Sequence, residues 1–335
     1  MSTPLVTVAV PTVRAGPMLE ECLRALRKQT LRQTEVVVVD NSGGQADLTS
    51  VVKLADAVIV QRENVGFGAA LNRVFRNAQA AFVATINDDA VAHPEWLEKL
   101  LEAAETHPEA GMFASCVVLA TGQLDSAGML ICGDGSSKQR GHRQAVESYQ
   151  QAEEVLCPSG SAALYRRHLF EDVGWFDEEF FLYGEDTDLG LRARWAGWSA
   201  WYVPQATVVH RYSQSTGAAS ALKAYLVERN RLRILWKNFP ARLLLCAPVT
   251  TLKRYYWHWV AWRRGQGLTG QFARQPAARR ALAAALIRAH WDWLRQLPGL
   301  MRARREIQRR ARLSAREFEA LVRRFSISPR RIAEL

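Results

Sequence analysis

Hydrophobic and polar positions follow two rhythms in the first hundred residues. Short apolar runs predict buried strands at 5–10, 35–39, 57–60 and 82–86. Apolar residues at helical spacing predict helices that begin near residue 17 and span 68–78 and 94–106. The strand at 35–39 holds four consecutive valines, which is typical of a strand buried on both faces of a parallel sheet. Strands separated by helices predict βαβ units, an α/β fold and a mostly parallel sheet.

The pattern changes further along the chain. It predicts a strand at 112–119, loops or a short hairpin over 122–151, helices at 166–172 and 186–196, and short strands at 201–203 and 207–209. After Ser220 the pattern becomes almost wholly helical. We therefore predict a catalytic domain over 1–222 and a helical region over 223–335.

Polar residues and glycines follow each of the first four predicted strands. Ligands bind beyond the carboxyl ends of the strands in such a sheet, so these positions form a candidate site. Pro11 and Thr12 follow the first strand and Asp40 follows the second. The segments 64–68 and 87–89 follow the third and fourth.

The local chemistry at these strand ends leaves two interpretations open. Asp88 and Asp89 could hold a divalent cation, or they could serve as turn and helix-capping residues. Asp40 could accept hydrogen bonds from a base or ribose, or form an Asx turn. Gly66 would permit close approach of the backbone to a ligand. Gly66 and Gly68 do not form a GxGxxG pattern, and the chain contains no Walker A pattern, so an NAD-binding or ATP-hydrolysing protein is disfavoured.

The densest acidic cluster is 185–188, immediately before a predicted helix. Its carboxylates could cap that helix, or one could act as a base in a partly desolvated site, because burial raises a carboxyl pKa. His210 follows the last predicted strand. A lone histidine is commonly a packing residue, and it would complete a metal site only if it met Asp89 in the fold.

An ordered set of motifs over residues 5–235 resembles glycosyltransferase family 2 and, within it, bacterial rhamnosyltransferases. The matching segments are Val8–Thr12, Val39–Ser42, Asn64–Gly68 with Asn72, Asn87–Asp89, Ser159–Leu164, Gly174–Phe181, Gly184–Arg192, His210 and Arg229–Arg231. The resemblance implies the GT-A fold, a Rossmann-like sheet flanked by helices, here with a C-terminal helical extension.

The resemblance also implies roles for individual residues. The nucleotide-binding residues would be Pro11, Thr12, Asp40, Asn64, Gly66, Asn72 and Asp88. Asp89 and His210 would hold Mg²⁺ or Mn²⁺ on the diphosphate, and Asp186 would be the catalytic base. Asn87 stands where the family commonly has aspartate, which is a better metal ligand. The implied reaction inverts the anomeric configuration, because one displacement occurs as Asp186 deprotonates an acceptor hydroxyl.

The resemblance also suggests a sugar donor and a class of acceptor. The overall pattern favours dTDP-rhamnose as the donor, with UDP-galactofuranose or another UDP-sugar as the alternative. The acceptor would be a glycan or lipid-linked glycan in the synthesis of a cell-envelope polysaccharide.

Charge is distributed unevenly between the two predicted regions. The whole chain carries a net charge of +11, but residues 223–335 contain 26 basic and 6 acidic residues and the first 222 residues are net acidic. Basic helices containing Trp and Leu suit an anionic membrane surface, so we expect a cytoplasmic enzyme at the inner face of the membrane. The alternatives are a solvated bundle or a contact between identical subunits. A nucleic-acid-binding protein is disfavoured by the acidic first region and by the lack of a recognised nucleic-acid-binding module.

Two further features bear on the compartment. No uncharged apolar run reaches 18 residues, and the N-terminus lacks the pattern of a signal peptide, so we expect neither a spanning helix nor secretion. The five cysteines are scattered without a CxxC pair, which predicts free thiols. Finally, Ser314 to Glu317 has the pattern of a capping box at the start of a helix.

Overall fold

The structure is a computed structural model that describes residues 3–211, 220–265 and 276–335. It divides into two compact units, one made of residues 1–129 and 139–213 and the other of residues 130–138 and 214–335. The segment 130–138 therefore belongs with the helices rather than with the sequence around it. The functional division expected at residue 222 stays a prediction.

The first unit is built on a mixed sheet whose ten strands, among the described residues, run in the order β10-β12-β6-β11-β4-β1-β2-β3, with β5 on β12 and β7 on β6. The strands are β1 (Val6–Thr12), β2 (Thr34–Asp40), β3 (Ala57–Val60), β4 (Phe82–Ile86), β5 (Ala90–Ala92), β6 (Ala110–Leu119), β7 (Leu124–Ser126), β10 (Glu153–Glu154), β11 (Ala162–Arg166) and β12 (Ser199–His210). Strands β4, β1, β2 and β3 are parallel, as the apolar runs predict. The α/β fold class is confirmed.

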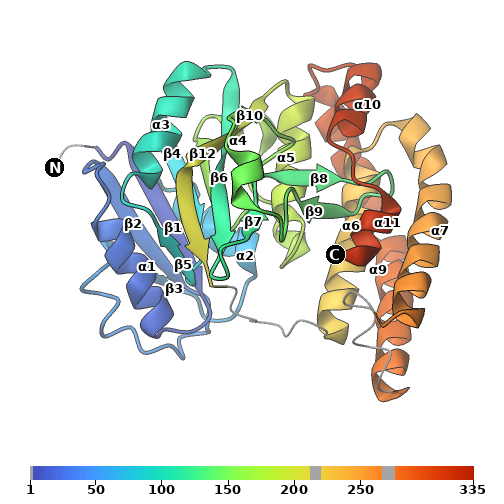
Figure 1. Ribbon diagram of the computed structural model, residues 1–335, viewed down its shortest axis with the longest axis horizontal. Helices are drawn as coiled ribbons and strands as arrows, with labels where there is room; N and C mark the ends of the chain where they lie inside the picture. Colours follow the sequence, from blue (N-terminus) through green and yellow to red (C-terminus); the bar gives the residue numbers. More distant parts are fainter. Residues whose placement is uncertain (1–2, 212–219, 266–275) are drawn as a thin grey trace. The chain divides into compact units, whose positions relative to one another are not determined.

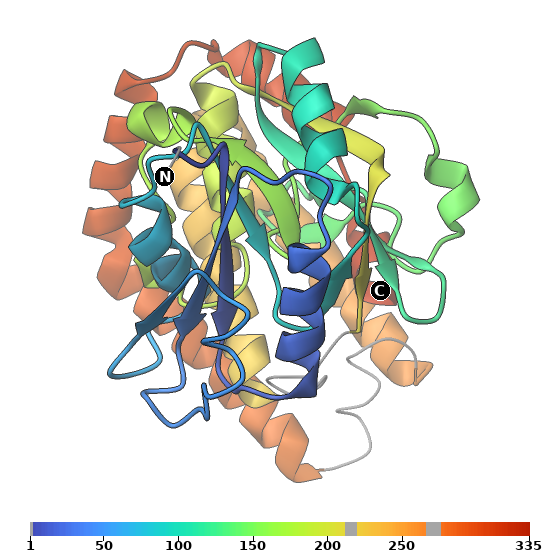
Figure 2. The same ribbon diagram turned by 90° about the vertical axis from the view of Figure 1, so that its left-hand side faces the viewer.

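Helices cover both faces of this sheet. They are α1 (Pro17–Arg27), α2 (Phe67–Phe75), α3 (Trp96–Thr106), α4 (Leu169–Val173) and α5 (Glu185–Trp195), with 3₁₀ turns at Val146–Tyr149 and Glu178–Phe180. Apolar residues of α1 and α3 share one core with alternate residues of β1 and β2, such as Val8 and Val36. Figure 2 shows α1 on one side of the first strands and α2 on the other. Alternation along each buried strand thus supplies an apolar face to both layers.

The segments at 166–172 and 201–209 differ from the sequence prediction. The expected helix at 166–172 begins only at Leu169, because β11 occupies the residues up to Arg166 and pairs antiparallel with both β4 and β6. The two short strands expected at 201–209 are one strand, β12, with a register shift between Val203 and Thr207. Pro204 lies in that shift, and a proline cannot donate a ladder hydrogen bond.

The second unit is helical, with a short hairpin of β8 (Met129–Ile131) and β9 (Ser137–Gln139) at its edge. Its helices are α6 (Ala221–Asn238), α7 (Ala241–Arg263), α9 (Pro276–Arg309), α10 (Ala315–Arg324) and α11 (Pro329–Glu334), labelled in Figure 1. Helix α10 begins with the predicted capping box, since Ser314 and Glu317 exchange hydrogen bonds with each other's backbone N–H. In the described part of the chain, no helix is long and apolar enough to cross a membrane.

A buried ion cluster holds the second unit together. Glu228 on α6 accepts hydrogen bonds from Arg231 at 2.6 Å and from Arg254 of α7 at 2.8 Å. Arg254 also donates to Asp134, which is fully buried in the hairpin segment, at 2.6 Å. Burial opposes the charge on Glu228, but the two arginines lower its pKa below the usual value. The cluster therefore joins the hairpin segment, α6 and α7 through matched charges.

Candidate active site

The ends of β1, β2 and β4 bring the first group of polar side chains together. Thr12 and Asp40 are register partners at the ends of β1 and β2, and Pro11 precedes Thr12. The Thr12 hydroxyl donates to Asp88 Oδ2, just beyond β4, at 2.6 Å. Burial raises the pKa of Asp88 to about 6, although the Thr12 hydrogen bond opposes that rise. The parallel strands thus place Thr12, Asp40 and Asp88 at one edge of the sheet.

Asp40 is fully buried, yet only half of its carboxylate is occupied. Oδ1 accepts a hydrogen bond from the Ser42 N–H at 2.9 Å, which is the Asx turn that the local sequence allows. Oδ2 has no hydrogen-bond partner among the residues that the structure describes. Leaving a buried carboxylate oxygen unpaired is costly, so this atom is available to a donor on a ligand.

The loop after β3 is braced by two asparagine side chains. Asn41 donates to Asn64 Oδ1 at 3.0 Å, and that same oxygen accepts from the Gly66 N–H at 3.0 Å. Gly66 has a φ of 88°, and a Cβ atom there would lie 2.3 Å from the Phe181 carbonyl oxygen. Glycine is therefore needed because the backbone of the loop at 64–68 touches the loop that precedes α5.

Asn72 lies on α2 and is completely buried. Its Nδ2 donates to the Phe176 carbonyl and to Glu178 Oε1, both at 2.9 Å, and its Oδ1 accepts from the Phe176 N–H at 3.1 Å. The amide thus holds the segment at 176–178 in place. Its expected part in the nucleotide pocket stays a prediction.

His210 and Asp89 come together as the sequence hypothesis requires. Strand β12 pairs with β5 so that His210 lies opposite Ala90, the residue after Asp89. Nε2 of His210 is 3.1 Å from Asp89 Oδ1 and 3.3 Å from Asn87 Nδ2. Both Asp89 and His210 are buried. The structure therefore meets the condition under which His210 could complete a metal site begun by a carboxylate.

Two residues that were not predicted from the sequence lie on the Nδ1 side of His210, away from Asp89. Nδ1 of His210 is 2.8 Å from Asp125 Oδ2, and Asp125 Oδ1 is 3.0 Å from His142 Nδ1. Burial disfavours the charged imidazole, but hydrogen bonds with Asp125 and Asp89 raise the pKa of His210 to about 9. Asp125 and His142 fall within the polar stretch at 122–151, for which we predicted loops or a short hairpin, and no spacing rule pointed to them.

The potential metal-ligating atoms of Asp89 and His210 suit a hard divalent cation that takes its other ligands from a substrate. Asp89 offers carboxylate oxygen, and His210 offers an imidazole nitrogen turned toward it. Among the described residues, no group of three or more His, Cys, Asp or Glu side chains is arranged to hold a metal ion. Two side chains, Asp89 and His210, could therefore take part in holding a cation that is also bound by phosphate oxygens.

Asp186 stands in the first turn of α5, and the residue as a whole is half-buried. Oδ2 accepts from the Gly160 N–H at 3.0 Å, and Oδ1 accepts from the Thr187 N–H at 2.6 Å. Burial raises the pKa of Asp186 above its usual value, and these hydrogen bonds limit the rise. The segment around Gly160 also joins Asp186 to the end of β4, because the Asn87 N–H donates to the Ser161 carbonyl at 2.9 Å.

The loop before Asp186 is strained. Phe181 and Tyr183 adopt positive φ angles of 63° and 72°, which side-chain-bearing residues rarely do. The neighbouring Glu185 is buried, and burial together with the charge of Asp186 raises its pKa to about 8. Of the two adjacent acids, Asp186 is the more exposed residue. It is the better candidate for a base that must touch an acceptor.

Sequence comparisons give the family. The model described as "Glycosyltransferase like family 2" matches residues 4–233. An N-acetylglucosaminyl-diphospho-decaprenol L-rhamnosyltransferase of Mycobacterium tuberculosis is 31% identical over 257 residues, which cover 67% of this chain and 82% of that protein. The O-antigen biosynthesis protein RfbC of Myxococcus xanthus is 25% identical, over 64% of this chain and 18% of that protein.

A solved structure gives the same answer for the fold. The crystal structure of GalNAc-T7 with UDP, GalNAc and Mn²⁺ superposes with a TM-score of 0.60 at 14% identity, covering 75% of this chain and 51% of that one. At this identity the likeness concerns the fold alone. The chain belongs to glycosyltransferase family 2 and has the GT-A fold.

Proposed function

We propose that this protein is an inverting, metal-assisted glycosyltransferase that moves a sugar from a nucleotide-sugar to a hydroxyl of a glycan or lipid-linked glycan. The observation that carries the proposal is the placement of Asp186. The residue is half-buried, its carboxyl has a pKa raised by desolvation, and the carboxylate accepts a hydrogen bond from the Gly160 N–H beside the end of β4. A carboxylate tuned in this way is suited to accept a proton from an alcohol.

The nucleotide would lie along the ends of β1 and β2. The unpaired Oδ2 of Asp40 would accept a hydrogen bond from an N–H of a pyrimidine or from a ribose hydroxyl. Thr12 and the loop at Asn64–Gly66 would border the same pocket. Thymine and uracil both carry an N–H donor, so this contact suits dTDP and UDP alike.

Asp89 and His210 would hold Mg²⁺ or Mn²⁺ through one carboxylate oxygen and Nε2. When bound, such a cation offsets the negative charge of a departing nucleoside diphosphate. Asp88, tied to Thr12, would keep the adjacent backbone in place.

Asp186 would remove the proton from the acceptor hydroxyl as that oxygen attacks the anomeric carbon. The new C–O bond forms on the face opposite the leaving group, and the bond to the diphosphate oxygen breaks. The proton ends on Asp186, and the bonding electrons leave with the nucleoside diphosphate. One displacement inverts the anomeric centre, as in inverting glycosidases with a sugar hydroxyl in place of water.

The proposed donor is dTDP-rhamnose, with a UDP-sugar such as UDP-galactofuranose as the alternative. The 31% identical rhamnosyltransferase supports the first, and its name also supports a lipid-linked acceptor. The test is a screen of purified protein with Mg²⁺ or Mn²⁺ against dTDP-rhamnose and several UDP-sugars, measuring nucleoside diphosphate release. Release from dTDP-rhamnose supports the proposal, release only from a UDP-sugar selects the alternative, and release from none contradicts both.

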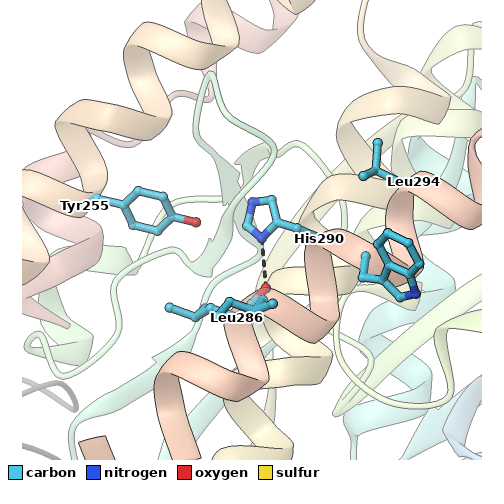
Figure 3. Close-up of a pocket in the computed structure, with 6 residues that line it drawn as sticks. Tyr255, Leu286, His290 and Leu294 are labelled. Carbon is cyan, nitrogen blue, oxygen red and sulfur yellow. Dashed lines mark hydrogen bonds between the residues drawn. The ribbon is translucent and has the colours of Figure 1, made fainter. Parts of the chain in front are cut away.

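We propose further that the helical unit binds an anionic membrane surface. Helix α7 exposes apolar side chains at intervals of three and four residues, namely Leu245, Val249, Leu252, Tyr256 and Trp259. Helix α9 likewise exposes Ile287, Trp291 and Leu294. An open pocket of about 490 Å³ lies between Tyr255 of α7 and the residues near His290 of α9 (Figure 3).

Cations accompany this apolar surface. Arg263 lies 5.1 Å from the Trp259 ring and Arg295 lies 5.6 Å from the Trp291 ring. Tryptophan beside arginine suits the headgroup level of a bilayer, where each cation adds about 1 kcal/mol of attraction to anionic lipid.

Flotation with phosphatidylglycerol vesicles, compared with phosphatidylcholine vesicles, tests the membrane proposal. We expect flotation with the anionic vesicles at low salt, lost in Trp259→Ser/Trp291→Ser and kept in Val227→Ser, which alters an exposed apolar residue of α6. Protein that stays in the soluble fraction contradicts the proposal. A dimer that dissociates in the double variant would assign the same surface to a subunit contact.

A further inference from the structure

Asp125 is a buried carboxylate that joins two histidines in the first unit, which we call the catalytic unit because it contains the candidate active site. It lies on β7 and is 1% exposed. Oδ2 is 2.8 Å from His210 Nδ1, and Oδ1 is 3.0 Å from His142 Nδ1. His142 Nδ1 also lies 3.2 Å from the Asp125 carbonyl oxygen. The same ring nitrogen therefore faces both the side chain and the backbone of Asp125. The result is a row of side chains, His142–Asp125–His210–Asp89, that ends at the proposed metal ligands.

The two ring nitrogens of His210 therefore have different neighbours. A ring that offers its Nε2 lone pair to a cation carries its proton on Nδ1, and the Asp125 carboxylate is placed to accept a hydrogen bond from that proton. That nitrogen is the one that faces Asp89 Oδ1, at 3.1 Å. A cation on Asp89 would separate that carboxylate from the Nε2 lone pair, whereas the opposite tautomer would set a lone pair directly against the Asp125 carboxylate.

We propose that Asp125, oriented by His142, is a positioning residue that fixes the ring and the tautomer of His210 so that Nε2 is available to a divalent cation at Asp89. This inference rests on the proposed assignment of Asp89 and His210 as metal ligands. Asp125 itself touches neither the proposed donor nor the reacting atoms.

The strand order shows why this arrangement is rigid. Strand β6 lies between β7 and β12, with Leu124 and His210 in adjacent register positions on its two sides, opposite Val118 and Leu119. Asp125 lies in the register shift between the β7 residues that pair with Val118 and Val117, so it and His210 flank the same strand. His142 occupies the second carboxylate oxygen and so prevents Asp125 from turning away. Because Asp125 holds the His210 ring through Nδ1, the ring loses little conformational freedom when Nε2 binds a metal.

The experiment measures Mn²⁺ affinity by electron paramagnetic resonance of free Mn²⁺, in the presence of saturating dTDP or UDP. We expect Asp125→Ala to raise the Mn²⁺ dissociation constant about 10–100-fold, the range for loss of such a supporting carboxylate. Nucleotide affinity measured without metal should stay within about twofold, because the proposed nucleotide contacts are made by Asp40 and Thr12 and not by Asp125. Asp125→Asn should give a smaller loss, because an amide oxygen can still accept from one of the two rings.

His142 provides a second route that removes no carboxylate. His142→Ala should weaken Mn²⁺ binding, and His142→Asn should restore much of it, since the asparagine amide N–H can donate from nearly the position of Nδ1. Rescue by this variant is not expected if the ring merely fills space.

A matched control separates positioning from stability. Asp134 is equally buried but bonds to Arg254 in the helical unit. We expect Asp134→Asn to lower the melting temperature and leave Mn²⁺ affinity unchanged. Asp125 variants that bind Mn²⁺ within twofold of the natural protein would overturn the positioning inference alone. Failure of the natural protein to bind Mn²⁺ with either nucleotide would overturn both this inference and the proposed metal site.

Discussion

The two units of this protein each bury a cluster of acids, but they balance them differently. In the helical unit, Glu228 and Asp134 both receive hydrogen bonds from Arg254. In the catalytic unit, Asp186 is held mainly by backbone N–H groups, and Asp40 and Glu185 each keep a buried oxygen without a hydrogen-bond partner among the described residues. The buried carboxylates of the helical unit thus form a matched cluster, in which arginines supply the opposite charge. Those of the catalytic unit form an open cluster, in which backbone N–H groups satisfy some oxygens and others have no partner among the described residues.

The pKa shifts follow this difference. Burial alone would raise the pKa of every one of these acids. Arginines reverse that effect for Glu228, whose pKa is lowered. Burial dominates for Glu185 and Asp88, whose pKa values rise to about 8 and about 6. A matched cluster stabilises a fold, whereas an open one leaves carboxylates available to ligands, cations and protons.

The largest effect should come from Asp186→Asn. General-base catalysis contributes about 10²–10⁴-fold, so we expect transfer to fall by that factor. Donor binding should remain within about threefold, because the change is nearly isosteric and leaves the Asp40 carboxylate intact. Stopped or continuous assays of nucleoside diphosphate release measure the first quantity, and calorimetry measures the second. Full activity in the variant would remove Asp186 from the role of base.

Mutations in the matched cluster of the helical unit should lower the free energy of unfolding and not the activity. Arg254→Met leaves two buried carboxylates short of a cation, and breaking such a pair costs about 3–5 kcal/mol. The control is Arg310→Ala, which removes an exposed pair with Glu306 at 2.8 Å and should cost about 0.3–0.5 kcal/mol. Chemical denaturation measures both. Equal losses in the two variants would show that the buried cluster is not a specific source of stability.

Gly66→Ala tests the contact between the two loops of the catalytic unit. Its positive φ and the approach of the Phe181 carbonyl to 2.3 Å of a Cβ atom predict a cost of about 1–3 kcal/mol. Because the loop after β3 would shift, we expect weaker nucleotide binding as well. Gly122→Ala, which has a similar φ of 84° but open space around its Cβ, controls for backbone strain alone. If both variants bind nucleotide like the natural protein, the loop contact does not shape the pocket.

The smallest effects should be opposite pH dependences of stability. With a folded-state pKa of about 8 against an ordinary value of 4.5, Glu185 keeps a proton that the unfolded chain loses. Its contribution to stability therefore falls as the pH rises between these values. The lowered pKa of Glu228 gives a contribution present above 4.5 and lost as the pH falls below it.

Melting curves at several pH values measure this contrast. Glu185→Gln should raise the melting temperature by a few degrees at pH 8 relative to pH 5. Glu228→Gln should lower it at neutral pH and have less effect in acid. The same sign of change in both variants at pH 8 would contradict the difference between the clusters.

Much of the fold could be predicted because its strands are apolar runs with clear ends. The four valines of β2 and the turn after Asp40 mark both a strand and a site. Strand β11 was missed, because its short apolar run pairs with strands distant in sequence and carries no periodic signal of its own. Asp89 and His210 were predicted separately, but their meeting depends on the register of β12 against β5. Asp125 and His142 could not be predicted, since only folding places them side by side.

The central claim is a single displacement at the anomeric carbon with Asp186 as the base. The most direct test is the anomeric configuration of the transferred sugar, measured by NMR couplings in the glycoside formed from the donor that the screen selects. The account predicts a configuration opposite to that of the donor. A product with the donor's own configuration would contradict it.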